Sequence, residues 1–73
     1  MNMKQLRQSK SIRAEEVAYK VGISSSTIRN WEQGRTIPKL RIDQLEKLLK
    51  LYDVSFESFC DAVKESFGEA YGA

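Results

Sequence analysis

The chain has 73 residues, with twelve Lys or Arg, ten Asp or Glu, no His and one Cys, and its formal net charge is +2. This length suits a single domain, close to the size at which one hydrophobic core is marginal without a partner. The lone Cys60 excludes an internal disulfide, and the absence of His leaves no zinc-type ligand spacing. No apolar run is long enough to span a membrane, and no glycine-rich phosphate loop follows a strand pattern. The polar start MNMKQLRQSK is also unlike a secretory leader. We therefore expect neither an enzyme, nor a metal site, nor a membrane protein.

Positive charge is concentrated in the first part of the chain. Residues 1–41 carry nine Lys or Arg against three acidic residues, a net charge of +6. Residues 42–73 carry three Lys against seven acidic residues, a net charge of −4. A basic segment of this kind attracts phosphates and so favours nucleic-acid binding. The alternative is that these are ordinary solvated surface charges.

The chain begins with a short predicted helix over residues 2–9, in which Leu6 and Met3 face inward. Lys10 and Ser11 form the link that follows it. Ile12 is expected to be buried just ahead of the second helix.

Residues 14–33 predict two short helices joined by a turn. Val17 and Val21 are four residues apart and share one face of the first of these helices. Gly22 then ends it in the left-handed conformation that glycine adopts cheaply, and Ser24 is a good N-cap for the next helix. That next helix keeps a polar face away from the core, made of Ser25, Ser26, Arg29 and Asn30.

The second half of the chain predicts two longer helices. The first covers residues 41–52, and its apolar residues recur at intervals of three and four. This stripe consists of Ile42, Leu45, Leu48, Leu49 and Tyr52. Asp53 breaks the helix, and Ser55 caps the last one, over residues 56–67. The stripe of the last helix consists of Phe56, Phe59, Cys60, Val63 and Phe67.

These elements predict an all-α fold, a compact bundle of five helices over residues 1–68, followed by a short flexible tail over residues 69–73. Val63, Phe67 and Tyr71 continue the last apolar stripe past the point that one small domain can cover. Exposed apolar surface of that kind usually marks an interface, so we expect a two-fold homodimer whose seam is formed by these residues of the last helix or by the region of the last two helices. The alternative is that the stripe folds back over the first helix.

The segment 14–33 resembles the helix-turn-helix of the Cro/XRE-type phage-repressor family. The small, glycine and aliphatic residues that the family requires at fixed places are here Ala18, Gly22 and Ile28. Its other core places hold Val17, Val21, Ile23 and Trp31. The sequence WEQGRTIP resembles the family's W-E-x-G-x-x-x-P ending. The resemblance covers residues 4–60 and implies a repressor-like DNA-binding domain whose recognition helix, residues 25–33, enters the major groove.

By position, the resemblance implies base contacts from four residues of the recognition helix: Ser25, Ser26, Arg29 and Asn30. Arg29 can read guanine through two parallel hydrogen bonds, whereas a serine hydroxyl discriminates weakly among bases. The alternative for Arg29 is a contact to phosphate alone. Contacts to the DNA backbone are implied for Arg13, Ala14, Thr27, Gln33, Arg35, Thr36 and Lys39.

The sequence departs from the family at the start of the second helix. Arg13 stands where the family has a Ser or Thr cap, and Ala14 stands where it has a glutamine that anchors a DNA phosphate. We expect the same anchoring from the charge of Arg13 and from the helix amides at Ala14, with Ser11 as the cap. Glu15 and Glu16 lie in the first turn of this helix, where acids favour the helix dipole, and we interpret them as helix-stabilising.

One structural pair is also implied by the resemblance. In the family, an arginine of the first helix pairs with the glutamate that precedes the glycine, and these places hold Arg7 and Glu32. The alternative is that Arg7 is a free surface charge.

We therefore expect a homodimeric transcriptional repressor that binds double-stranded DNA, needs no cofactor, and works in the cytoplasm of a prokaryote, where it is host- or phage-encoded. One alternative is an antitoxin-type module that binds a toxin and its own operator. Another is a DNA-tethering domain that belongs to a larger regulator or enzyme.

Overall fold

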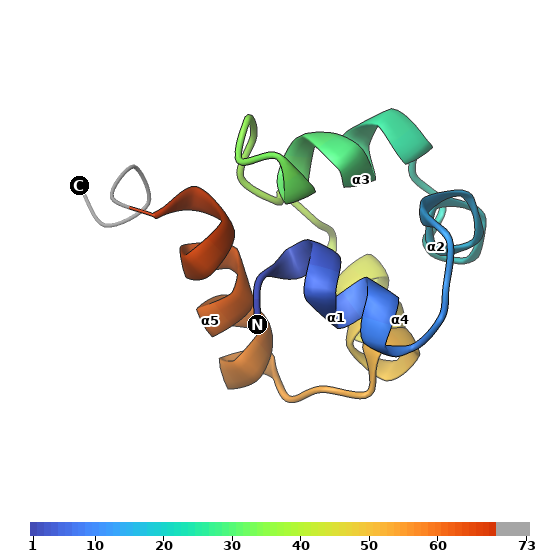
Figure 1. Ribbon diagram of the computed structural model, residues 1–73. Coiled ribbons are helices and arrows are strands. Elements are labelled where there is room, and N and C mark those ends of the chain that lie inside the picture. Colours follow the sequence, from blue (N-terminus) through green and yellow to red (C-terminus); the bar gives the residue numbers. More distant parts are fainter. Residues whose placement is uncertain (69–73) are drawn as a thin grey trace.

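The computed structural model describes residues 1–68, and within them the chain forms five helices and no strand (Figure 1). The helices are α1 (Met3–Ser9), α2 (Ala14–Val21), α3 (Ser25–Glu32), α4 (Ile42–Tyr52) and α5 (Phe56–Phe67). The predicted all-α fold is confirmed, and the helices differ from the predicted ranges by about one residue at an end. The predicted tail over residues 69–73, together with Tyr71, lies outside the described residues.

Capping serines fix where α3 and α5 begin. Ser24 Oγ accepts the amide of Thr27, and Ser55 Oγ accepts the amide of Ser58, each at 3.1 Å. Both serines were predicted as N-caps, and both predictions are confirmed. Gly22 ends α2 with φ of 84°, in the left-handed region that its position after the last apolar residue predicted.

The five helices enclose one apolar core. α1 lies in the middle of the bundle and packs against α3 and α5, while α2 packs against α3 and α4 (Figure 1). Trp31 and Tyr52 are the largest fully buried side chains. The other buried residues are Met3, Leu6, Ala14, Val17, Ala18, Val21, Ile28, Leu48, Phe59, Ala62 and Val63. All five helices therefore contribute to one core, and α3 is held in place through its own buried residues Ile28 and Trp31.

For two residues of the predicted apolar stripes, the prediction that they face the core is wrong. Ile42 is 87% exposed and Phe56 is 57% exposed. Each is the first residue of its helix, directly after the N-cap. Helical periodicity identifies residues that share a face, but at a terminus the neighbouring helices no longer extend far enough to cover that face.

Val63 is also not where we expected it. It is buried in the core, so little of its surface is left exposed for a partner, and Phe67 is half-buried against the same core. The cover comes from α1, because the amide of Met3 donates to Ser66 Oγ at 2.9 Å and holds the two helices together. The alternative, in which the stripe of α5 folds back over the first helix, therefore describes the structure.

The Tyr52 hydroxyl is a polar atom buried within this core. It has no hydrogen-bond partner among residues 1–68. Burial raises the pKa of Tyr52, and the negative charge of Glu32 raises it further, whereas the charge of Arg7 lowers it. The phenol is therefore neutral and carries an uncompensated cost of desolvation.

Candidate nucleic-acid interface

α2 and α3 pack against each other through their apolar faces, across a turn that contains Gly22 and Ser24. The residues that face the core include Val17, Val21 and Ile28, all of which are almost completely buried. Because these apolar residues bind one face of α3 to the bundle, the opposite face is presented outward. A polar helix face held by a rigid support is suited to entering a groove of another molecule.

An ion pair fixes the C-terminal end of α3. Arg7 Nε lies 2.6 Å from Glu32 Oε2, and Arg7 Nη2 donates to Glu32 Oε1 at 3.0 Å. The remaining terminal nitrogen, Nη1, donates to the carbonyl of Ile12 at 2.9 Å. The side chains are only 14% and 5% exposed, and the hydrogen bond to Glu32 raises the pKa of the Arg7 guanidinium. The expected pair is present, and it joins α1, α3 and the segment before α2.

The outward face of α3 carries the four side chains that the resemblance implied. Ser26 and Arg29 are exposed, and they lie three residues apart on one face of the helix. Ser25 and Asn30 are half-buried, and the carbonyl of Asn30 accepts the amide of Arg35 at 2.9 Å. The structure therefore brings these residues together on one surface.

Arg29 makes a contact that the sequence did not predict. Its Nη2 donates to the carboxylate of Glu15, which lies in the first turn of α2. This hydrogen bond from Arg29 is the largest influence on the Glu15 carboxyl and lowers its pKa. The sequence alone predicts for Glu15 only the stabilisation of its own helix. The two residues are fourteen positions apart on different helices, so no periodic pattern could have paired them.

The start of α2 adjoins this surface. Arg13 is its N-cap and is exposed, but its side chain makes no capping hydrogen bond. The expectation that Ser11 caps the helix is wrong, because Ser11 lies two residues earlier with φ of 54° in the link from α1. Within residues 1–68 the amides of Ala14 and Glu15 donate to no backbone acceptor, and the amide of Glu15 interacts with its own carboxylate. The amide of Ala14 remains available to an anion, whereas the Ala14 methyl group is buried.

A basic loop over residues 33–41 borders the other end of α3. Gly34 has φ of 72°, and a Cβ atom there would lie 2.8 Å from the carbonyl oxygen of Ser66 in α5. The loop therefore rests directly on the last turn of α5. The predicted backbone contacts of this loop are all exposed: Gln33, Arg35, Thr36 and Lys39.

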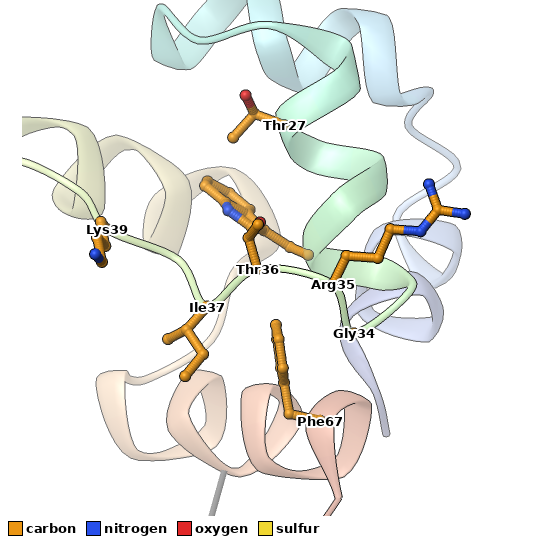
Figure 2. A pocket seen from close by; sticks show the side chains of 8 residues that line it. Thr27, Gly34, Arg35, Thr36, Ile37, Lys39 and Phe67 are labelled. Carbon is orange, nitrogen blue, oxygen red and sulfur yellow. The ribbon is translucent and has the colours of Figure 1, made fainter. Parts of the chain in front are cut away.

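An open hollow of about 600 Å³ lies between α3, this loop and the end of α5 (Figure 2). Thr27 lines it from α3 and Phe67 from α5, and Figure 2 shows Arg35 extending away from its centre. Thr27 Oγ1 lies 2.8 Å from Ser24 Oγ, so its hydroxyl is already engaged at the helix cap. Sequence reasoning gave no indication of this hollow, because it forms between segments far apart in the chain.

Most acidic side chains of residues 1–41 are held in ion pairs, whereas several cations of the same segment stay free of such pairs within residues 1–68. Of the three acidic residues in residues 1–41, Glu15 is paired with Arg29 and Glu32 with Arg7. Arg13, Arg35 and Lys39 are exposed, and none of them has an ion-pair partner among the described residues. Phosphate groups would meet these cations at both ends of α3.

A five-helix bundle in which a glycine turn leads to a capped helix with a polar outer face defines the helix-turn-helix class. The family described as a helix-turn-helix domain matches residues 2–59, and the chain belongs to this family. The match agrees with the resemblance to Cro/XRE-type proteins. No curated protein and no solved structure gives a significant match to the chain.

Membership of this family indicates DNA binding and regulation of transcription, and such domains are typically not enzymes. None of the helices in residues 1–68 is long and apolar enough to cross a bilayer. The same residues contain no group of three or more His, Cys, Asp or Glu that could hold a metal ion.

Proposed function

We propose that this protein binds duplex DNA in a sequence-specific manner and represses transcription, with α3 as the recognition helix in the major groove. The observation that carries the proposal is the outward polar face of α3, held between two surfaces suited to phosphate. On one side is the start of α2, with the free amide of Ala14 and the exposed Arg13, and on the other is the basic loop over residues 33–41. Backbone contacts at both ends of a helix fix its register, so that side chains between them can read bases.

In this arrangement Arg29 is the main base-reading residue, and Ser25, Ser26 and Asn30 read neighbouring positions. Arginine can present two parallel donors to guanine, which is worth about 1–3 kcal/mol against another base. Arg13, Thr27, Gln33, Arg35, Thr36 and Lys39 contact the sugar-phosphate backbone. Ala14 contributes through its amide, because its side chain faces the core.

A homodimer would place two copies of α3 roughly 34 Å apart, one turn of DNA, on a near-palindromic site. The proposed seam is an apolar groove of about 220 Å³ between the loop and helices α4 and α5, with the buried Val63 among its lining residues. The exposed Ile37 and Phe56 line this groove, and the exposed Ile42 begins the adjoining helix α4. Large apolar side chains beside an apolar groove favour a protein partner, and a second copy of the chain is the simplest one.

Sedimentation equilibrium tests this seam. Phe56→Glu should shift a dimer to monomer, whereas Tyr19→Glu, at a still more exposed aromatic on α2, should leave the dimer intact. If the chain alone is a monomer and instead copurifies from its host with another protein, the antitoxin-type function replaces the homodimer in this proposal.

DNA binding itself is tested by fluorescence anisotropy with a labelled duplex of mixed sequence, over a series of salt concentrations. The affinity should fall steeply with salt, because several phosphates are neutralised on binding. Arg35→Ala should reduce the slope by about one ion, while Lys47→Ala, an exposed lysine of α4, should not change it. No binding even at low salt would overturn the proposed function.

A further inference from the structure

The contact between Arg29 and Glu15 crosses from the recognition helix to the first turn of α2. Both side chains are about half exposed, at 46% for Arg29 and 54% for Glu15. The pair therefore lies at the surface where DNA would bind, and it is not part of the core. Among residues 1–68, Arg29 makes no other side-chain hydrogen bond.

The chemistry of the guanidinium leaves it usable while it is held. Arginine has five N–H donors in a planar fork, and the carboxylate of Glu15 engages Nη2 alone. Nη2 carries two N–H groups, and the one that Glu15 does not engage can act with the neighbouring nitrogen as a pair of parallel donors to the two acceptors that guanine presents in the major groove. A carboxylate on one edge of the fork thus orients the donors on the other edge.

Orientation before binding matters because arginine is flexible. A free arginine must lose its rotamer freedom when it contacts a base, and that loss reduces the gain from the correct contact. A side chain that is already held loses less. The advantage appears only where the held geometry matches the base, so it increases the difference between correct and incorrect sites.

We propose that Glu15 is a positioning residue for sequence readout: it holds Arg29 in the orientation that reads guanine, and its negative charge opposes binding to unmatched DNA. This inference rests on the proposed function. The second effect follows from position, because Glu15 directly follows Ala14, whose free amide would face a phosphate. A carboxylate there repels the DNA backbone unless Arg29 stays beside it.

The proposal predicts opposite changes in two quantities for Glu15→Ala. Affinity for mixed-sequence duplex should rise, because a negative charge beside the phosphates is removed. Discrimination at the base pair read by Arg29 should fall by about three- to tenfold, because Arg29 is no longer held before binding. A variant that merely folds less well would lose affinity for both kinds of DNA.

Glu16→Ala is the matched control. Glu16 is also exposed in the first turn of α2, and it makes no ion pair among the described residues. Its removal changes the net charge and the helix dipole in the same way, without touching Arg29. It should therefore raise the affinity for mixed-sequence duplex and keep the wild-type discrimination.

The experiment uses the full chain. A duplex is first selected from a random pool with the wild-type protein. Competition anisotropy then measures the affinity of four proteins for this duplex and for its single-base-pair variants: the wild type, Arg29→Ala, Glu15→Ala and Glu16→Ala. Arg29→Ala identifies the base pair, and thermal melting confirms that each variant is folded. Reduced discrimination at that base pair in Glu15→Ala, but not in Glu16→Ala, supports the proposal.

Wild-type discrimination in Glu15→Ala, or equal losses in both glutamate variants, would overturn it. So would an Arg29→Ala protein that keeps every base preference, although DNA binding would then still stand on the salt series. A wild-type protein that binds no duplex at low salt would overturn the proposed function itself.

Discussion

The guanidinium of Arg7 and the carboxylate of Glu32 meet through two parallel hydrogen bonds, with Nε and Nη2 of Arg7 directed at the two carboxylate oxygens. This geometry restricts both distance and angle, because the two planar groups must lie side by side. Glu32 is the last residue of α3, so the pair fixes the end of the recognition helix relative to α1. Its loss should therefore affect stability and DNA binding together.

We predict that Arg7→Met lowers the free energy of unfolding by about 3 kcal/mol, because it leaves the Glu32 carboxylate buried and unpaired. Urea denaturation measures this. The matched control is Lys10→Met, which removes a longer ion pair of 3.5 Å with the exposed Asp53 and should cost less than about 1 kcal/mol. Similar small losses in both variants would mean that the Arg7 pair does not stabilise the fold.

Gly34 should tolerate substitution less well than Gly22. Both have positive φ, so alanine at either position carries the cost of the left-handed conformation, about 1–2 kcal/mol. At Gly34 the new Cβ would also lie 2.8 Å from the Ser66 carbonyl oxygen, whereas at Gly22 nothing lies within 4 Å. Gly34→Ala should lose at least about 1 kcal/mol more than Gly22→Ala in thermal unfolding. Equal losses of stability in the two variants would show that α5 moves away from the new Cβ atom without destabilising the protein.

Tyr52→Phe should not destabilise the protein. The hydroxyl is buried without a partner in residues 1–68, and an unsatisfied buried polar group costs about 1–3 kcal/mol. Its removal should leave the free energy of unfolding unchanged or raise it by about 1 kcal/mol, as measured by urea denaturation. Tyr52→Ala, which leaves a cavity in the core, is expected to lose about 3–5 kcal/mol and serves as the contrast. A clear loss in Tyr52→Phe would mean that the hydroxyl is hydrogen-bonded in solution.

The titration of Glu15 should depend on Arg29. The pair lowers the pKa of this carboxyl below its ordinary value of 4.5 in the folded state. A lowered pKa in the folded state adds stability that is present above the ordinary value and is lost as the pH falls through the folded value. Arg29→Met should move the pKa of Glu15 back up toward 4.5, and NMR titration of the carboxyl groups measures this change. The pKa of the Asp43 carboxyl, which pairs with Arg41, should be the same in the wild type and in Arg29→Met.

Features set by neighbouring residues in the chain could be predicted from the sequence. The end of α2 at Gly22 depends only on backbone preference, and the caps at Ser24 and Ser55 depend only on a hydroxyl within reach of an amide. Periodicity likewise identified most of the core. It failed at Ile42 and Phe56, because the first residue of a helix can lie beyond its neighbours.

Features that depend on contacts between distant segments could not be predicted in this way. The burial of Val63 requires α1 to lie along α5, and the contact of Glu15 with Arg29 requires two helices to cross at one particular position. Arg7 and Glu32 were paired only through the family resemblance, since their spacing carries no signal. The arrangement of the candidate site is therefore a property of the packed bundle.

The contact of Gly34 with Ser66 connects the basic loop to the end of α5, on the side of the molecule opposite α2. No side chain separates the two segments there, so a shift of the last turn of α5 changes the resting position of the loop. A protein or a second copy that binds the end of α5 would thereby alter the affinity for DNA. By thermodynamic linkage, DNA would alter the affinity for that partner by the same factor.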